Sequence, residues 1–352
     1  MNAKRFRANC LPTAIGSLPH TAAAAACTTV LRYLPTIPIW PQLPKRSDAE
    51  NMYAQFVEGF PGAEVSGGAV CVDTEADLSL GLEALYGDYL AGNTQRFALS
   101  PERAAGFSSM LSLLRASPPP SLLAFKGQVT GPISQGLQMT DRNRRPLLYD
   151  EVLADALAKH LRLIASEQER QMAEVCPETM VFIDEPYLHA IGSAFIQLSR
   201  DQVIASLEEV FGGLRGLKGV HCCANTDWAM LAETSVDIIN FDAYTYAENL
   251  ALYPDDIKRF LWRGGIIAWG IVPNDEAILG GESVETLVER LLQAMDRLVR
   301  KGISLDSLLE AALITPTCGL GTMSVDGAEK TLLTLGRVSA ALRERFGLGD
   351  GR

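Results

Sequence analysis

The stretch Gly219-Val220-His221-Cys222-Cys223-Ala224-Asn225 has the pattern of a short β-strand that ends in a turn. Successive side chains of a strand point to opposite faces of the sheet, so His221 and Cys223 share one face and Cys222 occupies the other. An imidazole and a thiol on one face supply half of the four N, S or O ligands that a zinc ion takes. The stretch therefore predicts a strand that delivers metal ligands, with Cys222 packed on the opposite side against helices.

Two other candidate ligands also arrive where apolar runs end. Asp242 follows the run at residues 236–241, and Cys318 follows the run at residues 311–316. The alternative, that these residues bind no metal, has support as well. An H-x-C pair is a weak motif, and a lone cysteine is most often a small buried hydrophobe. The common position of all four residues at strand ends favours zinc.

The order of apolar and helical segments predicts an α/β fold. Eight apolar segments of strand length alternate with helical patterns, at residues 11–17, 36–40, 121–129, 179–183, 218–223, 237–241, 265–270 and 311–315. This alternation fits a (β/α)8 TIM barrel better than a doubly wound sheet. Because no repeat or low-complexity linker divides the chain, we expect one domain over residues 1–352. Within it, residues 1–10 are expected as an N-terminal extension and residues around 60–76 as a small insertion with a hairpin.

Polar side chains gather at the ends of these segments. Barrels place their chemistry at the C-terminal ends of the strands. Here those ends carry polar or conformationally special residues, namely Gly16-Ser17, Gln42, Gly131, Asp184-Glu185, His221, Cys223, Asp242, Asn274-Asp275 and Cys318. Their gathering on one rim predicts an enzyme. His160, by contrast, falls within a helix predicted at residues 149–174 and is expected at its surface.

Composition narrows the classes of function. The net charge of −11 argues against nucleic acid or an anionic membrane as the main partner. The sequence has no apolar run of about 18 residues or more, and no signal-peptide segment follows residues 1–9, so we expect a cytoplasmic protein. The seven cysteines are odd in number and irregularly spaced, which is typical of thiols or metal ligands rather than of disulfides.

Seven short motifs follow one another along residues 11–325. They are Ile15-Gly16-Ser17, Pro44-Lys45-Arg46-Ser47-Asp48, Thr130-Gly131-Pro132, Ile183-Asp184-Glu185-Pro186, His221-Cys222-Cys223, Asn240-Phe241-Asp242 and Thr317-Cys318-Gly319-Leu320. In this order they resemble the C-terminal catalytic barrel of cobalamin-independent methionine synthase, in its short, single-barrel form. The wider superfamily includes uroporphyrinogen decarboxylase. The resemblance implies a methyltransferase that moves a methyl group to the thiol of homocysteine and forms methionine.

The resemblance also implies a set of metal ligands. Zinc would be held by His221, Cys223 and Cys318, and Asp242 stands where the family has a glutamate. Aspartate is one methylene shorter, so contact between Asp242 and the metal stays open. Three protein ligands and an exchangeable position are the arrangement of a catalytic zinc. That position would take the homocysteine thiol and deprotonate it.

The amino-acid part of homocysteine is assigned by the same resemblance. It implies that Ile15, Gly16 and Ser17 hold the carboxylate and that Asp184 binds the ammonium group. Both assignments fit the chemistry, because the free N–H groups of a turn bind anions and a carboxylate binds a cation. Where the family has a second substrate-binding glutamate, the chain has Gln42, which can bond the amino group without charge.

Departures from the family concern the methyl donor. The folate-using enzymes have a tryptophan after the Gly-Pro turn and a proton-donating histidine after the seventh strand. Here the corresponding positions are near Gln138 and within residues 272–275. A folate nitrogen leaves readily only when a general acid protonates it, whereas a corrinoid needs no proton. The sequence therefore favours a methylcorrinoid donor, methylcobalamin or a corrinoid protein, with Asp275 left as a candidate catalytic acid for folate.

The sequence leaves four alternatives open. One is a zinc methyltransferase that carries a methyl group from a corrinoid protein to another thiol, such as coenzyme M. Another is a methyltetrahydrofolate-dependent methionine synthase. A uroporphyrinogen decarboxylase-like lyase would need no zinc, so the Cys and His set counts against it. A non-catalytic zinc-stabilised protein should unfold when its metal is chelated, because a structural site contributes folding energy.

Overall fold

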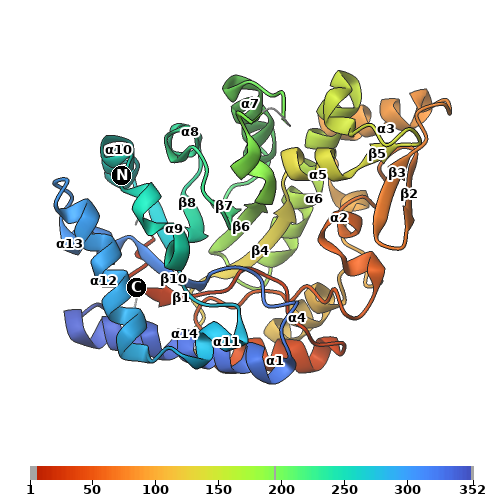
Figure 1. Cartoon of the computed structure of the whole chain (residues 1–352). Helices are drawn as coiled ribbons and strands as arrows, with labels where there is room; N and C mark the ends of the chain where they lie inside the picture. The colour runs from red at the N-terminus through yellow and green to blue at the C-terminus, as the bar shows by residue number, and fades with distance from the viewer. Residues whose placement is uncertain (1–5, 194–195, 350–352) are drawn as a thin grey trace.

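A computed structural model describes residues 6–193 and 196–349. Its centre is a curled sheet of seven parallel strands in the order β1-β10-β9-β8-β7-β6-β4 (Figure 1). These strands are β1 (Leu11–Pro12), β4 (Phe125–Thr130), β6 (Thr179–Asp184), β7 (Leu217–Cys222), β8 (Ile238–Asp242), β9 (Ile266–Val272) and β10 (Ala312–Pro316). The predicted α/β class is confirmed, although β1 is much shorter than expected.

The strand expected at residues 36–40 forms no ladder. This part of the chain makes two isolated parallel bridges instead, Ser17 to Gln42 and Ile39 to Lys126. It therefore runs between the continuation of β1 and β4. Proline lacks the N–H that a ladder needs, and Pro38 and Pro41 interrupt the segment. The prediction of a regular strand at this position is wrong.

Most helices lie outside the curl of the sheet (Figure 1). They are α1 (Ala23–Tyr33), α2 (Met52–Gln55), α3 (Ser79–Ala91), α4 (Ala105–Ala116), α5 (Pro132–Gln138), α6 (Glu151–Ala173), α7 (Arg200–Phe211), α8 (Trp228–Glu233), α9 (Ala243–Leu250), α10 (Pro254–Trp262), α11 (Glu276–Gly280), α12 (Val284–Val299), α13 (Leu305–Glu310) and α14 (Val325–Phe346). The long helices α6 and α14 pack against β4 and β10. Within the described ranges, no helix combines the length and apolarity needed to cross a membrane.

The expected insertion contains a hairpin. Strands β2 (Ala63–Ser66) and β3 (Ala69–Val72) pair antiparallel around Gly67 and Gly68. Both glycines have positive φ, 55° and 77°, as the favoured two-residue hairpin turns require. The short β5 (Thr140–Asp141) pairs with β3 and completes a separate three-stranded sheet.

The N-terminal extension expected at residues 1–10 lies partly outside the described residues, which begin at Phe6. Cys10 is fully buried, and its N–H donates to the Ala312 carbonyl of β10 at 2.8 Å. The end of the expected extension is therefore packed along the sheet.

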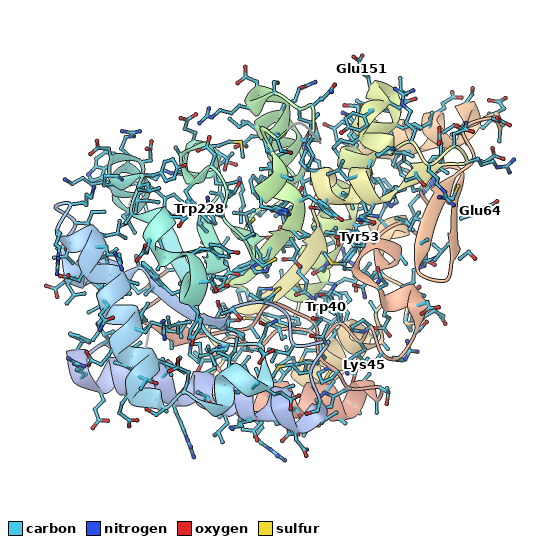
Figure 2. The ribbon with its side chains drawn as sticks, viewed as in Figure 1. Trp40, Lys45, Tyr53, Glu64, Glu151 and Trp228 are labelled. Atoms are coloured by element: carbon cyan, nitrogen blue, oxygen red, sulfur yellow. The ribbon has the colours of Figure 1, made fainter. Side chains whose placement is uncertain are left out.

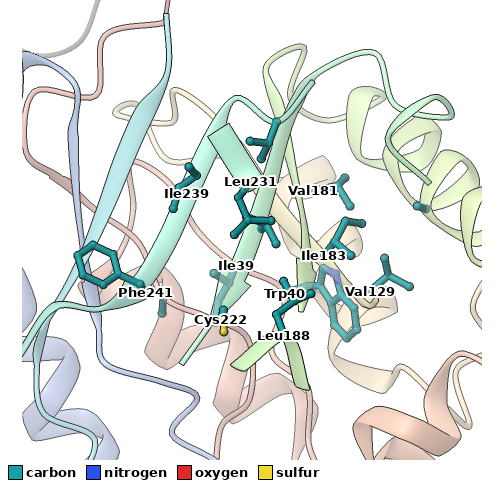
Figure 3. Packing of buried hydrophobic residues seen from close by; sticks show 14 of the residues in the cluster. Ile39, Trp40, Val129, Val181, Ile183, Leu188, Cys222, Leu231, Ile239 and Phe241 are labelled. Carbon is teal, nitrogen blue, oxygen red and sulfur yellow. The ribbon is translucent and has the colours of Figure 1, made fainter. Parts of the chain in front are cut away.

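Apolar side chains form separate groups on the two faces of the sheet. Inside the curl lies a small group that includes Leu11, Met180, Phe182, Ile238, Ile266, Ala268 and Leu313. The outer face packs against the helices through a larger group that includes Val129, Val181, Ile183, Leu231, Ile239 and Phe241 (Figure 3). Cys222 belongs to the outer group and has no exposed surface, so its predicted packing is confirmed.

His160 lies inside the outer layer, so its expected surface position is wrong. Its side chain is fully buried, with Nε2 3.1 Å from the Phe56 carbonyl oxygen and the ring edge-on to Phe60 and Phe97. Burial lowers the pKa of His160 to about 4, so the imidazole is neutral at pH 7. The residues that cover it come from distant segments, which a helical pattern does not reveal.

Candidate functional site

Three of the predicted metal ligands meet at the C-terminal rim of the sheet. His221 lies near the end of β7, Cys223 follows that strand directly, and Cys318 lies in the loop after β10. Their ligand atoms, one nitrogen and two sulfurs, all lie within 4.8 Å of one another. Residues that are 97 positions apart in the chain, His221 and Cys318, have Nε2 and Sγ only 3.7 Å apart.

This group of three side chains fits a tetrahedral zinc ion. Zinc bonds of about 2.0–2.3 Å place neighbouring ligand atoms of a tetrahedron roughly 3.3–3.8 Å apart. The separation of 3.7 Å between His221 Nε2 and Cys318 Sγ lies in that range. Two thiols and an imidazole are also a donor set that zinc favours. The three side chains can therefore hold the ion and leave a fourth position for a substrate.

Asn240, to which the motif assigned no role, sets how His221 faces the thiols. Its amide donates to the Ala268 carbonyl at 2.8 Å and to Thr315 Oγ1 at 2.9 Å, so its Oδ1 points the other way. That oxygen lies 2.5 Å from His221 Nδ1. Because an amide oxygen only accepts, Nδ1 carries a proton and Nε2 is the nitrogen left for a metal.

The three side chains of this group shift one another's pKa values. Hydrogen bonds from Cys318 and His221 lower the pKa of Cys223 far below the usual thiol range, and the bond to Cys223 raises the pKa of Cys318. Burial lowers the pKa of His221, but the bond to Cys223 and the charge of Asp184 outweigh it, so that pKa is raised. The group therefore already favours one thiolate, which is the form that binds metals.

The loop that carries Cys318 is held from two directions. Thr317 Oγ1 donates to Asn274 Oδ1 at 2.8 Å on one side. On the other side, the Gly321 N–H donates to Ser17 Oγ at 3.2 Å. The turn predicted to bind the substrate carboxylate therefore touches the loop that supplies a metal ligand.

Asp184 ends β6 directly opposite His221 of β7. Its side chain is buried, and its Oδ1 has no hydrogen-bond partner among the described residues. A buried carboxylate oxygen without a partner is costly unless a donor reaches it. Burial raises the pKa of Asp184, against the lowering effects of Lys126 and His221. Its Oδ1 is therefore available to a donor group of a bound molecule.

Lys126 is a buried cation that the sequence motifs did not single out. It is fully buried in β4, and its Nζ donates to the Ile15 carbonyl and to Gln128 Oε1 at 3.3 Å. Burial lowers the pKa of Lys126, and the charge of Asp184 opposes that shift. The lysine balances this carboxylate and ties β4 to the turn after Ile15. Its signal in the sequence was the alternation of polar side chains along an otherwise apolar strand.

Gln42 packs tightly beside Gly16. The Gln42 Oε1 lies 2.5 Å from the position that a Cβ on Gly16 would take, and Gln128 Cδ lies 2.9 Å from it. A side chain at position 16 would therefore have to displace the buried side chains of Gln42 and Gln128. The Gln42 Nε2 donates to Gln55 Oε1 at 2.7 Å.

Glu185 couples the Gly-Pro motif to the Asp-Glu-Pro motif. Its fully buried carboxylate accepts from the N–H groups of Ile133 and Ser134, both at 2.8 Å, and from Ser134 Oγ at 2.6 Å. A Cβ on Gly131 would lie 2.2 Å from the Glu185 Oε1, so only glycine fits there. Burial raises the pKa of Glu185 to about 7, opposed by these hydrogen bonds. Glu185 is thus used in joining the ends of β4 and β6 through α5.

Asp242 and Asp275 both begin helices. Asp242 lies outside the group of three ligands, and its Oδ1 accepts from the Thr245 N–H at 2.9 Å at the start of α9. Asp275 is exposed, and its Oδ1 accepts from the N–H groups of Ala277 and Ile278, both at 2.9 Å, at the start of α11. Both carboxylates are therefore engaged as helix N-caps.

Helix α2 covers the rim above β4. Thr130 Oγ1 donates to the Met52 carbonyl at 2.7 Å, which joins the two elements. Tyr53 lies toward the middle of the molecule, whereas Glu64 and Glu151 lie at its margin (Figure 2). Burial, together with nearby acidic groups, raises the pKa of Tyr53. The segment around α2 therefore contributes an aromatic side chain near the rim.

Solved structures of two other proteins share this fold. The chain is similar to a B12-independent methionine synthase from Shewanella sp. W3-18-1 in complex with selenomethionine, with a TM-score of 0.62 and 18% identity, over 96% of this chain and 98% of that chain. It is also similar to a methyltransferase from Methanosarcina mazei, with a TM-score of 0.58 and 13% identity, over 98% and 95% of the two chains. No protein-family model and no curated protein matches the sequence. The resemblance to methionine synthase is thus confirmed for the fold.

Proposed function

We propose that this chain is a zinc-dependent methyltransferase that moves a methyl group to the thiol of homocysteine and forms methionine. The observation that carries the proposal is the convergence of His221, Cys223 and Cys318, with ligand atoms within 4.8 Å. The buried, unpartnered Oδ1 of Asp184 lies on the neighbouring strand end. One group can hold a metal that activates a thiol, and the other can bind the amine of the same acceptor.

Several other residues of the site have a role in this scheme. Zinc at the three ligands would supply a Lewis acid that lowers the pKa of the acceptor thiol. Asp184 binds the acceptor's ammonium group, and the Ile15-Gly16-Ser17 turn binds its carboxylate. Lys126 balances the charge of Asp184, and Asn240 keeps His221 Nε2 directed at the thiols.

We propose a methylcorrinoid, methylcobalamin or a corrinoid protein, as the methyl donor. The acceptor sulfur forms a bond to the methyl carbon as the cobalt–carbon bond breaks, and the electron pair of that bond leaves with cobalt as cob(I)alamin. This leaving group takes no proton, so the step needs no general acid. The two hydrogen bonds that Asp275 Oδ1 accepts favour a structural role for the carboxylate over proton donation to folate.

We also propose that the sheet closes into a (β/α)8 barrel within a single domain. The segment at residues 37–42 supports closure because it is hydrogen-bonded on both sides. On one side the Gln42 N–H donates to the Gly16 carbonyl at 3.1 Å, and on the other the Trp40 N–H donates to the Lys126 carbonyl at 3.3 Å.

The main alternative is the same zinc chemistry with another acceptor thiol, such as coenzyme M. The buried Asp184 favours an acceptor with a cationic group, because a carboxylate repels an anionic one. A uroporphyrinogen decarboxylase-like lyase would make no use of two thiols and an imidazole at the rim. A purely structural zinc site would couple metal loss to unfolding.

The test uses zinc-loaded protein with homocysteine and either methylcobalamin or methyltetrahydrofolate, and with coenzyme M as a second acceptor. We expect methionine to form with methylcobalamin as the donor and not with methyltetrahydrofolate. The protein should hold about one zinc ion per chain. Methionine from folate would refute the proposed donor, and methylated coenzyme M without methionine would refute the proposed acceptor. Chelation should abolish transfer and leave the circular dichroism spectrum unchanged. Unfolding on chelation would favour a structural site. A purified protein that binds no zinc would refute the mechanism.

A further inference from the structure

Two buried glutamines form a chain of hydrogen bonds behind the Gly16 turn. Gln55 has no exposed surface and Gln42 is 6% exposed. The Gln42 Nε2 donates to Gln55 Oε1 at 2.7 Å, and the Gln55 Nε2 donates to the Arg103 carbonyl oxygen. The chain of hydrogen bonds therefore begins at the Arg103 backbone carbonyl and ends at the side-chain amide of Gln42.

The backbone carbonyl sets the orientation of both amides. A carbonyl oxygen only accepts, so Gln55 has to present its NH₂ group to Arg103 and its Oε1 to Gln42. Gln42 then has to present its NH₂ group to Gln55, which leaves its own Oε1 on the opposite side. That oxygen lies beside Gly16, 2.5 Å from the position of an added Cβ. Among the described residues, no group donates a hydrogen bond to it.

We propose that Gln55 is a positioning residue for the acceptor's ammonium group, because it locks Gln42 as a hydrogen-bond acceptor beside Gly16. The inference rests on the proposed function and adds a residue that neither the motifs nor the metal group include. Without Gln55, the Gln42 amide is free to rotate and to present its NH₂ group to the acceptor. The ammonium group of the acceptor is also a hydrogen-bond donor, so the two groups cannot form a hydrogen bond.

The amide chain also narrows the class of acceptor. An ammonium group has three N–H donors, of which Asp184 Oδ1 and Gln42 Oε1 each accept one. The subsite then has one carboxylate and one neutral amide, and the buried Lys126 lies close enough to affect the carboxylate. Such a subsite selects thiols that carry a protonated amine over thiols that lack one.

The experiment compares two thiols on the zinc-loaded protein by isothermal titration calorimetry. These are homocysteine and 4-sulfanylbutanoate, in which hydrogen replaces the amine. Gln55→Leu should weaken homocysteine binding by about 10- to 100-fold, the effect of a lost hydrogen bond to a charged group, and leave 4-sulfanylbutanoate unchanged. Gln55→Met serves as a second variant of similar length, so that poor folding of one does not decide the result.

A double-mutant cycle separates positioning from general packing. If Gln55 acts through Gln42, then Gln42→Leu and the Gln42→Leu/Gln55→Leu double variant should lose homocysteine binding equally. The inference would be overturned if the affinity losses of the two single variants added up in the double variant. It would also be overturned if both thiols lost affinity equally. Gln135→Leu is the matched control, because this buried amide donates to the Tyr53 carbonyl at 2.7 Å, whereas the Gln42 amide donates to Gln55. It should leave the ratio of the two affinities unchanged.

The outcome also separates this inference from the proposed function. Homocysteine that binds Gln55→Leu and Gln55→Met as tightly as it binds the unmodified protein would overturn the inference and leave the proposed function standing. Failure of the unmodified zinc-loaded protein to bind homocysteine would overturn both.

Discussion

Cys222 and Cys223 are neighbours in the chain and lie in opposite environments. Cys222 is fully buried in the outer apolar layer, and burial raises its pKa to about 12. Cys223 lies at the polar rim, where hydrogen bonds from Cys318 and His221 lower its pKa. One step along the chain thus separates an inert thiol from one suited to bind a metal.

The same contrast holds along the inner face of the sheet. At the level of Phe182 and Ile238 the interior is apolar, and two residues further along these strands it carries Asp184 and Asn240. The period of two sets which face a side chain occupies, and its position along the strand sets whether it reaches the rim. A functional side chain in this fold needs both the inner face and the C-terminal level.

The largest expected effect separates the metal-binding side chains from Cys222. Cys318→Ala or His221→Ala should remove zinc and lower methyl transfer by more than about 100-fold, since second-shell changes alone cost about 10- to 100-fold. Cys222→Ala should keep both zinc and activity. Metal analysis and the methionine assay measure this difference. Loss of zinc from Cys222→Ala alone would show that the assigned register of β7 is wrong.

The next comparison uses neighbours on β8. Asn240→Leu should weaken zinc binding by about 10- to 100-fold, because His221 Nδ1 loses its acceptor. Phe241→Leu, on the opposite face of the same strand, should lower stability and leave zinc affinity unchanged. Competition with a chelator measures both affinities. Equal zinc affinities for the two variants would show that Asn240 does not orient His221.

The buried His160 should make the stability of the fold depend on pH in acid. His160 has a folded-state pKa of about 4, below the unfolded value of about 6.5, so the unfolded chain binds more protons between these values. This contribution to stability is full above the unfolded pKa and falls by about 2 kcal/mol from pH 7 to pH 5.

His160→Gln should remove that component of the pH dependence, because glutamine does not titrate and its amide can still donate to the Phe56 carbonyl. Urea unfolding at pH 7 and pH 5 measures the difference between the variant and the unmodified chain. If the variant and the unmodified chain lost the same stability between pH 7 and pH 5, the pH dependence would belong to other groups.

The smallest expected effect concerns Asp242, which lies at the rim but outside the group of ligands. Asp242→Ala should cost about 1 kcal/mol through the lost cap of α9, and Asp242→Asn should cost little because asparagine caps as well as aspartate. Both variants should keep their zinc. Thermal unfolding and metal analysis test this, and zinc loss from the asparagine variant would make Asp242 a ligand.

The sequence was most informative where a local pattern decides the structure. Alternation along single strands placed Cys222 in the outer layer and His221 on the inner face, and glycine pairs marked the hairpin turn. Two predictions failed, one because local prolines outweigh an apolar pattern and one because distant segments cover a side chain. The strand expected at residues 36–40 is broken by prolines, and His160 is covered by residues from segments far away in the chain.

By itself the sequence determined which residue types stand at strand ends and on which face, because side-chain alternation depends only on adjacent residues. Tertiary structure alone decided which of them meet. Cys318 reaches His221 across 97 positions, and the Arg103 carbonyl orients Gln42 through Gln55. Such contacts depend on how separate strands align and how helices pack over them, and no local pattern encodes that alignment.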